Sequence, residues 1–158
     1  MQHSRLSMTR GPSWPGSRMT DPPAEAVVVD ASVFVDLLAG TALAEAATAR
    51  LAGTSMHAPA HMDAEVLSAL GRMQRAGELT TAEVDGGLAT LAAAPVTRHP
   101  AHELMAGAWS RRADLRLSDA LYVELATRIR VPLLTTDHRL ARASAVAESI
   151  SAEVPSQD

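Results

Sequence analysis

Short apolar runs alternate with helical stretches along this 158-residue chain, and this alternation constrains the fold more than any other feature. In the run Ala26–Asp30, three consecutive valines precede the aspartate, a pattern typical of a buried strand. Val131–Thr135 is a second run of this kind. Because strands separated by helices pair in parallel and are covered on both faces, the sequence predicts an α/β/α sandwich with a mostly parallel central sheet.

Capping and helix-breaking residues indicate the remaining elements. Strands are expected at 56–58, at 95–98 on the sheet edge and at 146–150. Helices are expected at 32–38, 42–51, 59–75, 81–93, 101–113 and 118–130, with a short one from 138. The Pro-, Ser-, Gly- and Arg-rich residues 1–24 show no periodicity and are expected to be disordered. One domain is therefore expected at 25–150, followed by a frayed tail at 151–158.

Composition excludes several kinds of chemistry. The chain has no cysteine, which rules out disulfides, thiol catalysis and cysteine-ligated metals. All 14 of its basic residues are arginine, which rules out reactions that need a lysine, such as Schiff-base formation. Because the formal net charge is −4, any binding of nucleic acid must use a local basic patch. No apolar run is long enough to span a bilayer and no secretory signal is evident, so a cytoplasmic location is expected.

Two aspartates follow the two clear strands. Asp30 ends the first strand, and Asp137 comes shortly after the strand that ends at Thr135. Ligands of open α/β sheets bind beyond the carboxyl ends of the strands, so both carboxylates are expected at one edge of the sheet. The alternative is that strand-end aspartates only cap turns or helices.

Further acids lie on helices. Asp119 borders the apolar face in the first turn of its helix, where interaction with the helix dipole is the alternative explanation. Glu124 on the same helix is expected to face outward and to pair with Arg128. In the helix at 59–75, periodicity does not clearly separate Glu65 from Asp63, although the helix dipole explains Asp63 more simply.

Four segments resemble the motifs of PIN domains, especially those of bacterial VapC-like toxins, and they occur in the order that the family shows. They are Val27–Val35, Pro59–Leu70, Leu117–Ala126 and Leu133–Ala141. The resemblance covers about residues 26–143 and implies a PIN-like α/β/α sandwich. It favours Glu65 over Asp63 and implies a catalytic, metal-binding set of four acids: Asp30, Glu65, Asp119 and Asp137. It also implies supporting hydroxyl groups, from Ser32 and Thr136.

The resemblance implies an endoribonuclease. All-oxygen ligands suit Mg²⁺ or Mn²⁺, which can activate water for attack on a phosphodiester. The expected protein is the toxin of a toxin–antitoxin pair, a homodimer that cuts structured RNA (tRNA or rRNA) and is blocked by a cognate antitoxin. Arginines near the acids are candidates for RNA binding, namely Arg112, Arg116 and Arg139, although solvated helix-face charges are the alternative.

Other functions remain open at this point. Within the class, the alternative is a housekeeping PIN nuclease that processes RNA, and outside it a non-catalytic PIN module that only binds a partner. An acid-pocket phosphohydrolase would need a second acid two residues after Asp30, where Ser32 stands. Asp36 is expected to face the solvent, and the histidines are expected to be surface or capping groups. Met105 and Trp109 are expected to lie in the core or an interface.

Overall fold

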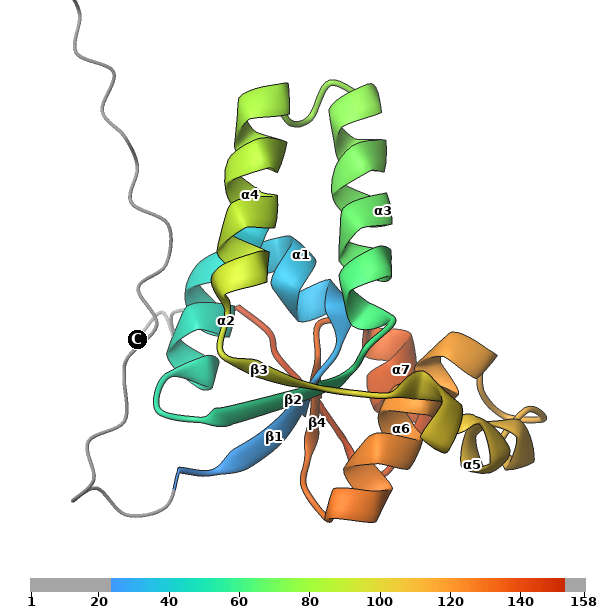
Figure 1. Ribbon diagram of the computed structural model, residues 1–158. Helices are drawn as coiled ribbons and strands as arrows, with labels where there is room; N and C mark the ends of the chain where they lie inside the picture. The colour runs from blue at the N-terminus through green and yellow to red at the C-terminus, as the bar shows by residue number, and fades with distance from the viewer. Residues whose placement is uncertain (1–23, 153–158) are drawn as a thin grey trace, which may run out of the picture.

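A computed structural model describes residues 24–152 of the chain, and its centre is a five-stranded parallel sheet (Figure 1). The strands are β1 (Ala26–Val29), β2 (Ser55–Pro59), β3 (Val96–His99), β4 (Leu133–Thr135) and β5 (Ala147–Ser149). Their order in the sheet is β3-β2-β1-β4-β5, and every pairing is parallel. The predicted α/β sandwich with a parallel sheet is therefore confirmed. The expected disordered extension and most of the expected tail lie outside the described residues.

Helices cover both faces of this sheet. They are α1 (Ala31–Ala39), α2 (Ala44–Leu51), α3 (Met62–Arg75), α4 (Thr81–Ala93), α5 (Met105–Ser110), α6 (Leu117–Ile129) and α7 (His138–Ala143), with a short 3₁₀ helix, η1, at Ala101–Glu103. In Figure 1, α1, α3 and α4 pack together above the sheet, while α6 lies below it with α5 against its outer side. Among residues 24–152, no helix is long and apolar enough to cross a membrane.

The core is centred on β1, which lies between β2 and β4. Val27, Val28 and Val29 are all fully buried, because helices cover both faces of the strand. A strand buried on both faces has no polar alternation, which explains the continuous valine run in the sequence. The largest fully buried side chains are Tyr122 from α6 and Phe34 from α1.

Two element boundaries differ from the sequence prediction. Pro59 ends β2 instead of opening a helix, and α3 begins at Met62. The segment 101–113 is broken into η1 and α5, because the amide of Leu104 bonds to the carbonyl of Ala101 in a tighter turn than an α-helix makes. By contrast, α1 ends at Gly40 as expected, where the left-handed backbone (φ 66°) favours glycine.

Candidate active site

The predicted acids come from four elements that meet at the carboxyl edge of the sheet. Asp30 follows β1 and precedes α1, and Asp137 lies between β4 and α7. Glu65 and Asp119 lie in the first turns of α3 and α6. Asp30 interacts electrostatically with both Glu65 and Asp119, and Asp119 also interacts with Asp137, so the structure brings the four acids into one neighbourhood.

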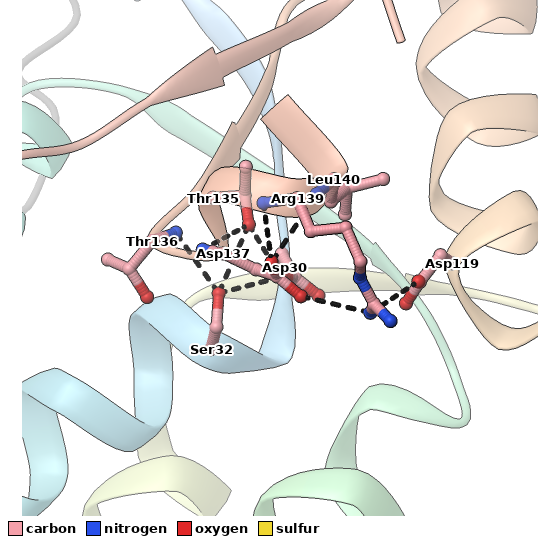
Figure 2. Close-up of polar contacts among 8 residues, drawn as sticks. All are labelled: Asp30, Ser32, Asp119, Thr135, Thr136, Asp137, Arg139 and Leu140. Carbon is pink, nitrogen blue, oxygen red and sulfur yellow. Dashed lines mark hydrogen bonds and ion pairs between the residues drawn. The ribbon is translucent and has the colours of Figure 1, made fainter. Parts of the chain in front are cut away.

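Asp30 is the most buried of these acids, with 6 % of its surface exposed. Its Oδ2 accepts hydrogen bonds from the hydroxyls of Ser32 at 2.6 Å and Thr135 at 2.8 Å (Figure 2). Although Asp30 precedes α1, its side chain makes no capping hydrogen bond. Burial raises the pKa of Asp30 to about 6; the two hydroxyls oppose this effect, and the negative charges of Asp119 and Glu65 add to it. Helix capping therefore does not explain this aspartate.

The hydroxyl groups around Asp30 differ in part from the predicted ones. Ser32 contacts Asp30 as expected, and its Oγ also accepts a hydrogen bond from the Thr136 amide at 3.1 Å. The Thr136 hydroxyl points elsewhere and donates to Asp36 at 2.6 Å. Thr135, which the motif comparison did not single out, is fully buried and contacts Asp30 instead. The strand register could have identified it, because Val29 pairs with Leu134 and the next residues along are Asp30 and Thr135.

Asp36 is not the solvent-facing residue that was expected. It is half-buried, and its two oxygens accept hydrogen bonds from the hydroxyls of Thr41 and Thr136, each at 2.6 Å. These bonds connect α1 to the loop after β4 and to the loop before α2. The prediction failed because helical periodicity reports which face of α1 is apolar but not which polar loops fold over its other side.

Glu65 and Asp63 differ in their hydrogen-bond partners. The hydroxyl of Tyr122 on α6 donates to Oε2 of Glu65 at 2.5 Å, and Nε2 of His61 lies 3.5 Å from the same oxygen. Asp63 instead receives two hydrogen bonds from the guanidinium of Arg98, at 2.6 and 3.0 Å. Glu65 is thus the acid of α3 that neighbours Asp30.

Asp137 does cap a helix. Its Oδ1 accepts from the backbone amides of Arg139 at 2.8 Å and Leu140 at 3.4 Å, in the first turn of α7. Burial acts to raise the pKa of Asp137, but these amides and the Arg139 guanidinium outweigh it and hold the pKa below its ordinary value. The capping alternative therefore describes Oδ1, whereas Oδ2 accepts a hydrogen bond from the guanidinium of Arg139 at 3.2 Å.

A cation of the protein itself lies between two of the acids. Nη2 of Arg139 is 3.2 Å from Oδ2 of Asp137 and 3.4 Å from Oδ2 of Asp119 (Figure 2). Burial raises the pKa of Asp119; Arg139 opposes this, and the nearby acids Asp137 and Glu65 add to it. The pocket therefore carries more negative charge than Arg139 neutralises.

The donor set of this pocket suits a hard cation. Among residues 24–152, no three His, Cys, Asp or Glu side chains are arranged to hold one ion together. Mg²⁺ does not require such a cage, because it binds through one or two carboxylates and keeps several waters. The raised pKa values of Asp30 and Asp119 indicate negative charge that a cation would stabilise. The assignment of all four acids as ligands stays a prediction.

The three candidate RNA-binding arginines lie in different surroundings. Arg139 contacts two acids, and Arg116 interacts electrostatically with Asp119. Arg112 instead stacks on the ring of Trp109 of α5, 4.8 Å from its centroid. Only Arg116 and Arg139 thus interact with the acids of the pocket.

The outward orientation expected for Glu124 is wrong. Glu124 is buried between α5 and α6, where it pairs with Arg111 as well as with the expected partner Arg128. Gly107 of α5 packs directly against the Glu124 carboxylate, leaving no space for a side chain. Hydropathy along one helix could not reveal this contact, because a second helix supplies it.

Three histidines are also less exposed than expected. The rings of His57 and His99 meet between β2 and β3, with Nδ1 and Nε2 3.0 Å apart. His61 packs against Tyr122, with ring centroids 4.9 Å apart. Met105 and Trp109 are, in contrast, about 60 % exposed and so do not belong to the core.

The structure combines a parallel sheet with four acids at its carboxyl edge, one after β1, one before α7 and one each in α3 and α6. Sequence comparison identifies the family to which such a chain belongs. The chain belongs to the PIN-domain family, whose model matches residues 27–146. It is 65 % identical over 132 residues to Ribonuclease VapC3 of Mycobacterium tuberculosis, covering 83 % of this chain and 96 % of the relative. Ribonuclease VapC1 of the same organism is 39 % identical over 118 residues, covering 73 % and 89 %.

Solved structures agree on the fold. PAE2754 from Pyrobaculum aerophilum matches with a TM-score of 0.59 at 23 % identity, and the match covers 80 % of this chain and 84 % of the PAE2754 chain. A chain of a toxin-antitoxin complex from Klebsiella pneumoniae has a TM-score of 0.57 at 16 % identity, covering 79 % and 98 %. At these identities the likeness concerns the fold alone.

Proposed function

We propose that this chain is a metal-dependent endoribonuclease and the toxin of a toxin–antitoxin pair. The identity of 65 % to a protein named Ribonuclease VapC3 extends over 96 % of that relative, so the whole nuclease domain is included. The observation that carries the proposal is the buried carboxylate of Asp30, which has other carboxylates as neighbours. Its ionisation at neutral pH costs folding free energy, because the charge is buried. A divalent cation would offset that cost.

Each residue of the pocket has a role in this proposal. Mg²⁺ or Mn²⁺, when bound, supplies an activated water and a positive charge for the phosphodiester. Asp30, Glu65 and Asp119 would hold the ion, with Asp137 completing the pocket. The hydroxyls of Ser32 and Thr135 fix the orientation of the Asp30 carboxylate, because both donate to its Oδ2. Arg139 and Arg116 are suited to bind the phosphates that flank the cleaved bond.

The proposed substrate is a structured RNA such as tRNA or rRNA. Aromatic residues make up 3 % of the chain, so base stacking is a minor source of affinity and recognition would depend on phosphate positions. The proposed partners are a cognate antitoxin and a second copy of the chain. Exposed Met105 and Trp109, four residues apart on α5, offer apolar surface for such an interface.

Cleavage of RNA by the purified chain tests the proposal. The parent is expected to cut RNA with Mg²⁺ or Mn²⁺ and to stop in EDTA, whereas Asp30→Asn is expected to cut at least about a hundredfold more slowly, because the charge that binds the ion is gone. Cleavage by Asp30→Asn at the parental rate would remove Asp30 from the site. A non-catalytic PIN module would show neither cleavage nor a rise in melting temperature with Mn²⁺.

Expression in bacteria separates the toxin from a housekeeping nuclease. The parent alone is expected to arrest growth and Asp30→Asn to be harmless. Unimpaired growth with soluble, RNA-cleaving parent protein would favour the housekeeping alternative.

A further inference from the structure

Tyr122 connects two of the elements that carry the acids. It belongs to α6, three residues after Asp119, so the two side chains project from the same side of that helix. Tyr122 is fully buried, and its hydroxyl donates to Oε2 of Glu65 on α3 at 2.5 Å. The backbone of Ala31, next to Asp30, interacts with the same hydroxyl. A single phenol thus lies among the residues that position three of the four acids.

His61 encloses this hydrogen bond without replacing it. Its ring lies 4.9 Å from the Tyr122 ring and is tilted by 55° to it. Nε2 of His61 is 3.5 Å from Oε2 of Glu65, and neither ring nitrogen has a hydrogen-bond partner among the described residues. His61 therefore packs the phenol in place, and the short contact to Glu65 is made by Tyr122.

The two oxygens of Glu65 are consequently different. Oε2 is bound to the Tyr122 hydroxyl, while no residue in the part of the chain that the structure describes donates to Oε1. The side chain of Glu65 is one-third exposed, so Oε1 is the oxygen available to a ligand. Groups that hydrogen-bond to metal-binding carboxylates fix their orientation and contribute strongly to metal affinity.

We propose that Tyr122 is a positioning residue that holds Oε2 of Glu65 and directs Oε1 to the divalent ion as a single-oxygen ligand. This inference rests on the proposed metal-dependent function. Without the phenol hydroxyl, the Glu65 carboxylate can rotate away from the other acids, whose negative charges repel it. The role is conformational, because Tyr122 itself touches neither the ion nor RNA.

The test is the affinity of metal-free protein for Mn²⁺, measured by electron paramagnetic resonance of the free ion. Tyr122→Phe is expected to weaken Mn²⁺ binding about tenfold or more. The Mn²⁺ concentration for half-maximal RNA cleavage is expected to rise by the same factor, with activity recovering at saturating Mn²⁺. In a Glu65→Gln background, Tyr122→Phe should cause no further weakening, because the ligand that it positions is already lost. If Tyr122 only stabilised the fold, Tyr122→Phe would weaken Mn²⁺ binding in the Glu65→Gln background as well.

Thr127→Val is the matched control. It also removes one hydroxyl from α6, one that donates to the backbone of Val123, and it is expected to bind Mn²⁺ like the parent. Parental affinity in folded Tyr122→Phe overturns the inference while leaving the proposed function intact, provided that Glu65→Gln binds more weakly. Absence of Mn²⁺ binding by the parent overturns both.

A second measurement needs no change at Tyr122. This is the only tyrosine of the chain, but two tryptophans absorb in the same range, so the difference spectrum with and without metal is compared between the parent and Glu65→Gln to isolate the phenol. Mg²⁺ is expected to shift this absorbance in the parent, because a cation at Oε1 withdraws charge from the carboxylate that accepts the hydrogen bond. The shift should be lost in Glu65→Gln. A parental spectrum that is unchanged at saturating Mg²⁺ contradicts the inference even if Tyr122→Phe does not fold.

Discussion

The buried charge of Asp30 should make the metal-free protein less stable than a variant without it. Asp30 is 6 % exposed, and burial raises its pKa from 3.8 to about 6. At 1.36 kcal/mol per pKa unit, this difference corresponds to about 3 kcal/mol of destabilisation at pH 7. Asp30→Asn removes that cost. Its amide oxygen can still accept from Ser32 and Thr135, since both hydroxyls donate to one oxygen.

Thermal unfolding in EDTA, followed by circular dichroism between pH 4 and pH 8, measures the effect. Below about pH 4, Asp30 is protonated in both the folded and the unfolded chain, so parent and variant should have similar melting temperatures. As the pH rises from about 4 to about 6, the unfolded chain ionises Asp30 more readily than the folded chain does, so the parent loses stability and the variant does not. At roughly 2–4 °C per kcal/mol, the variant should melt roughly 6–12 °C higher at pH 7. Added Mn²⁺ should raise only the melting temperature of the parent.

The control is Asp85→Asn, which removes the same charge from an exposed position of α4. It should leave the melting temperature within about 2 °C of the parent at every pH. A metal-free Asp30→Asn variant that melts below the parent at pH 7, or a difference that does not grow between pH 4 and pH 6, would refute the argument from buried charge.

Four further substitutions, one of them a control, test other parts of the structure. Thr135→Val keeps the shape of a fully buried side chain but removes its hydrogen bond to Asp30. It should lower the free energy of unfolding, measured with urea at pH 7, by about 2 kcal/mol, and an unchanged value would contradict this role. Gly107→Ala places a Cβ on top of the Glu124 carboxylate and should cost about 1–3 kcal/mol. Gly86→Ala, whose Cβ meets no described residue within 4 Å, should instead stabilise the protein by about 0.5–1 kcal/mol. Arg139→Ala removes the guanidinium that competes for two acids, so Mn²⁺ should bind more tightly while the KM for RNA rises; a KM equal to that of the parent would exclude Arg139 from RNA binding.

Much of the fold could be predicted from the sequence, because its elements follow local rules. The valines of β1 predict a strand buried on both faces, and the structure has it at the centre of the sheet. Gly40 ends α1 with the left-handed backbone that glycine favours. The prediction of one helix at 101–113 is wrong, because Leu104 and its neighbours form tighter turns that hydropathy does not distinguish from an α-helix.

Less of the site could be predicted, because its contacts join distant segments. The position of Asp30 follows from the end of its strand, whereas Glu65 is indicated by the resemblance of its segment to a family motif. Thr135 was missed because only the pairing of β1 with β4 identifies it. Glu124 was misjudged because its burial depends on α5, and the contact between Glu65 and Tyr122 joins residues 57 positions apart. Such contacts require knowledge of which elements pack together.

The position of β1 between β2 and β4 has a consequence for how the protein is made. Thr135, which completes the surroundings of Asp30, follows it by 105 residues, so a chain still in synthesis cannot assemble the acidic pocket until Thr135 has left the ribosome. Under the proposed function, a nascent chain would therefore be inactive up to that point, and the proposed antitoxin could bind the chain before it cleaves any RNA.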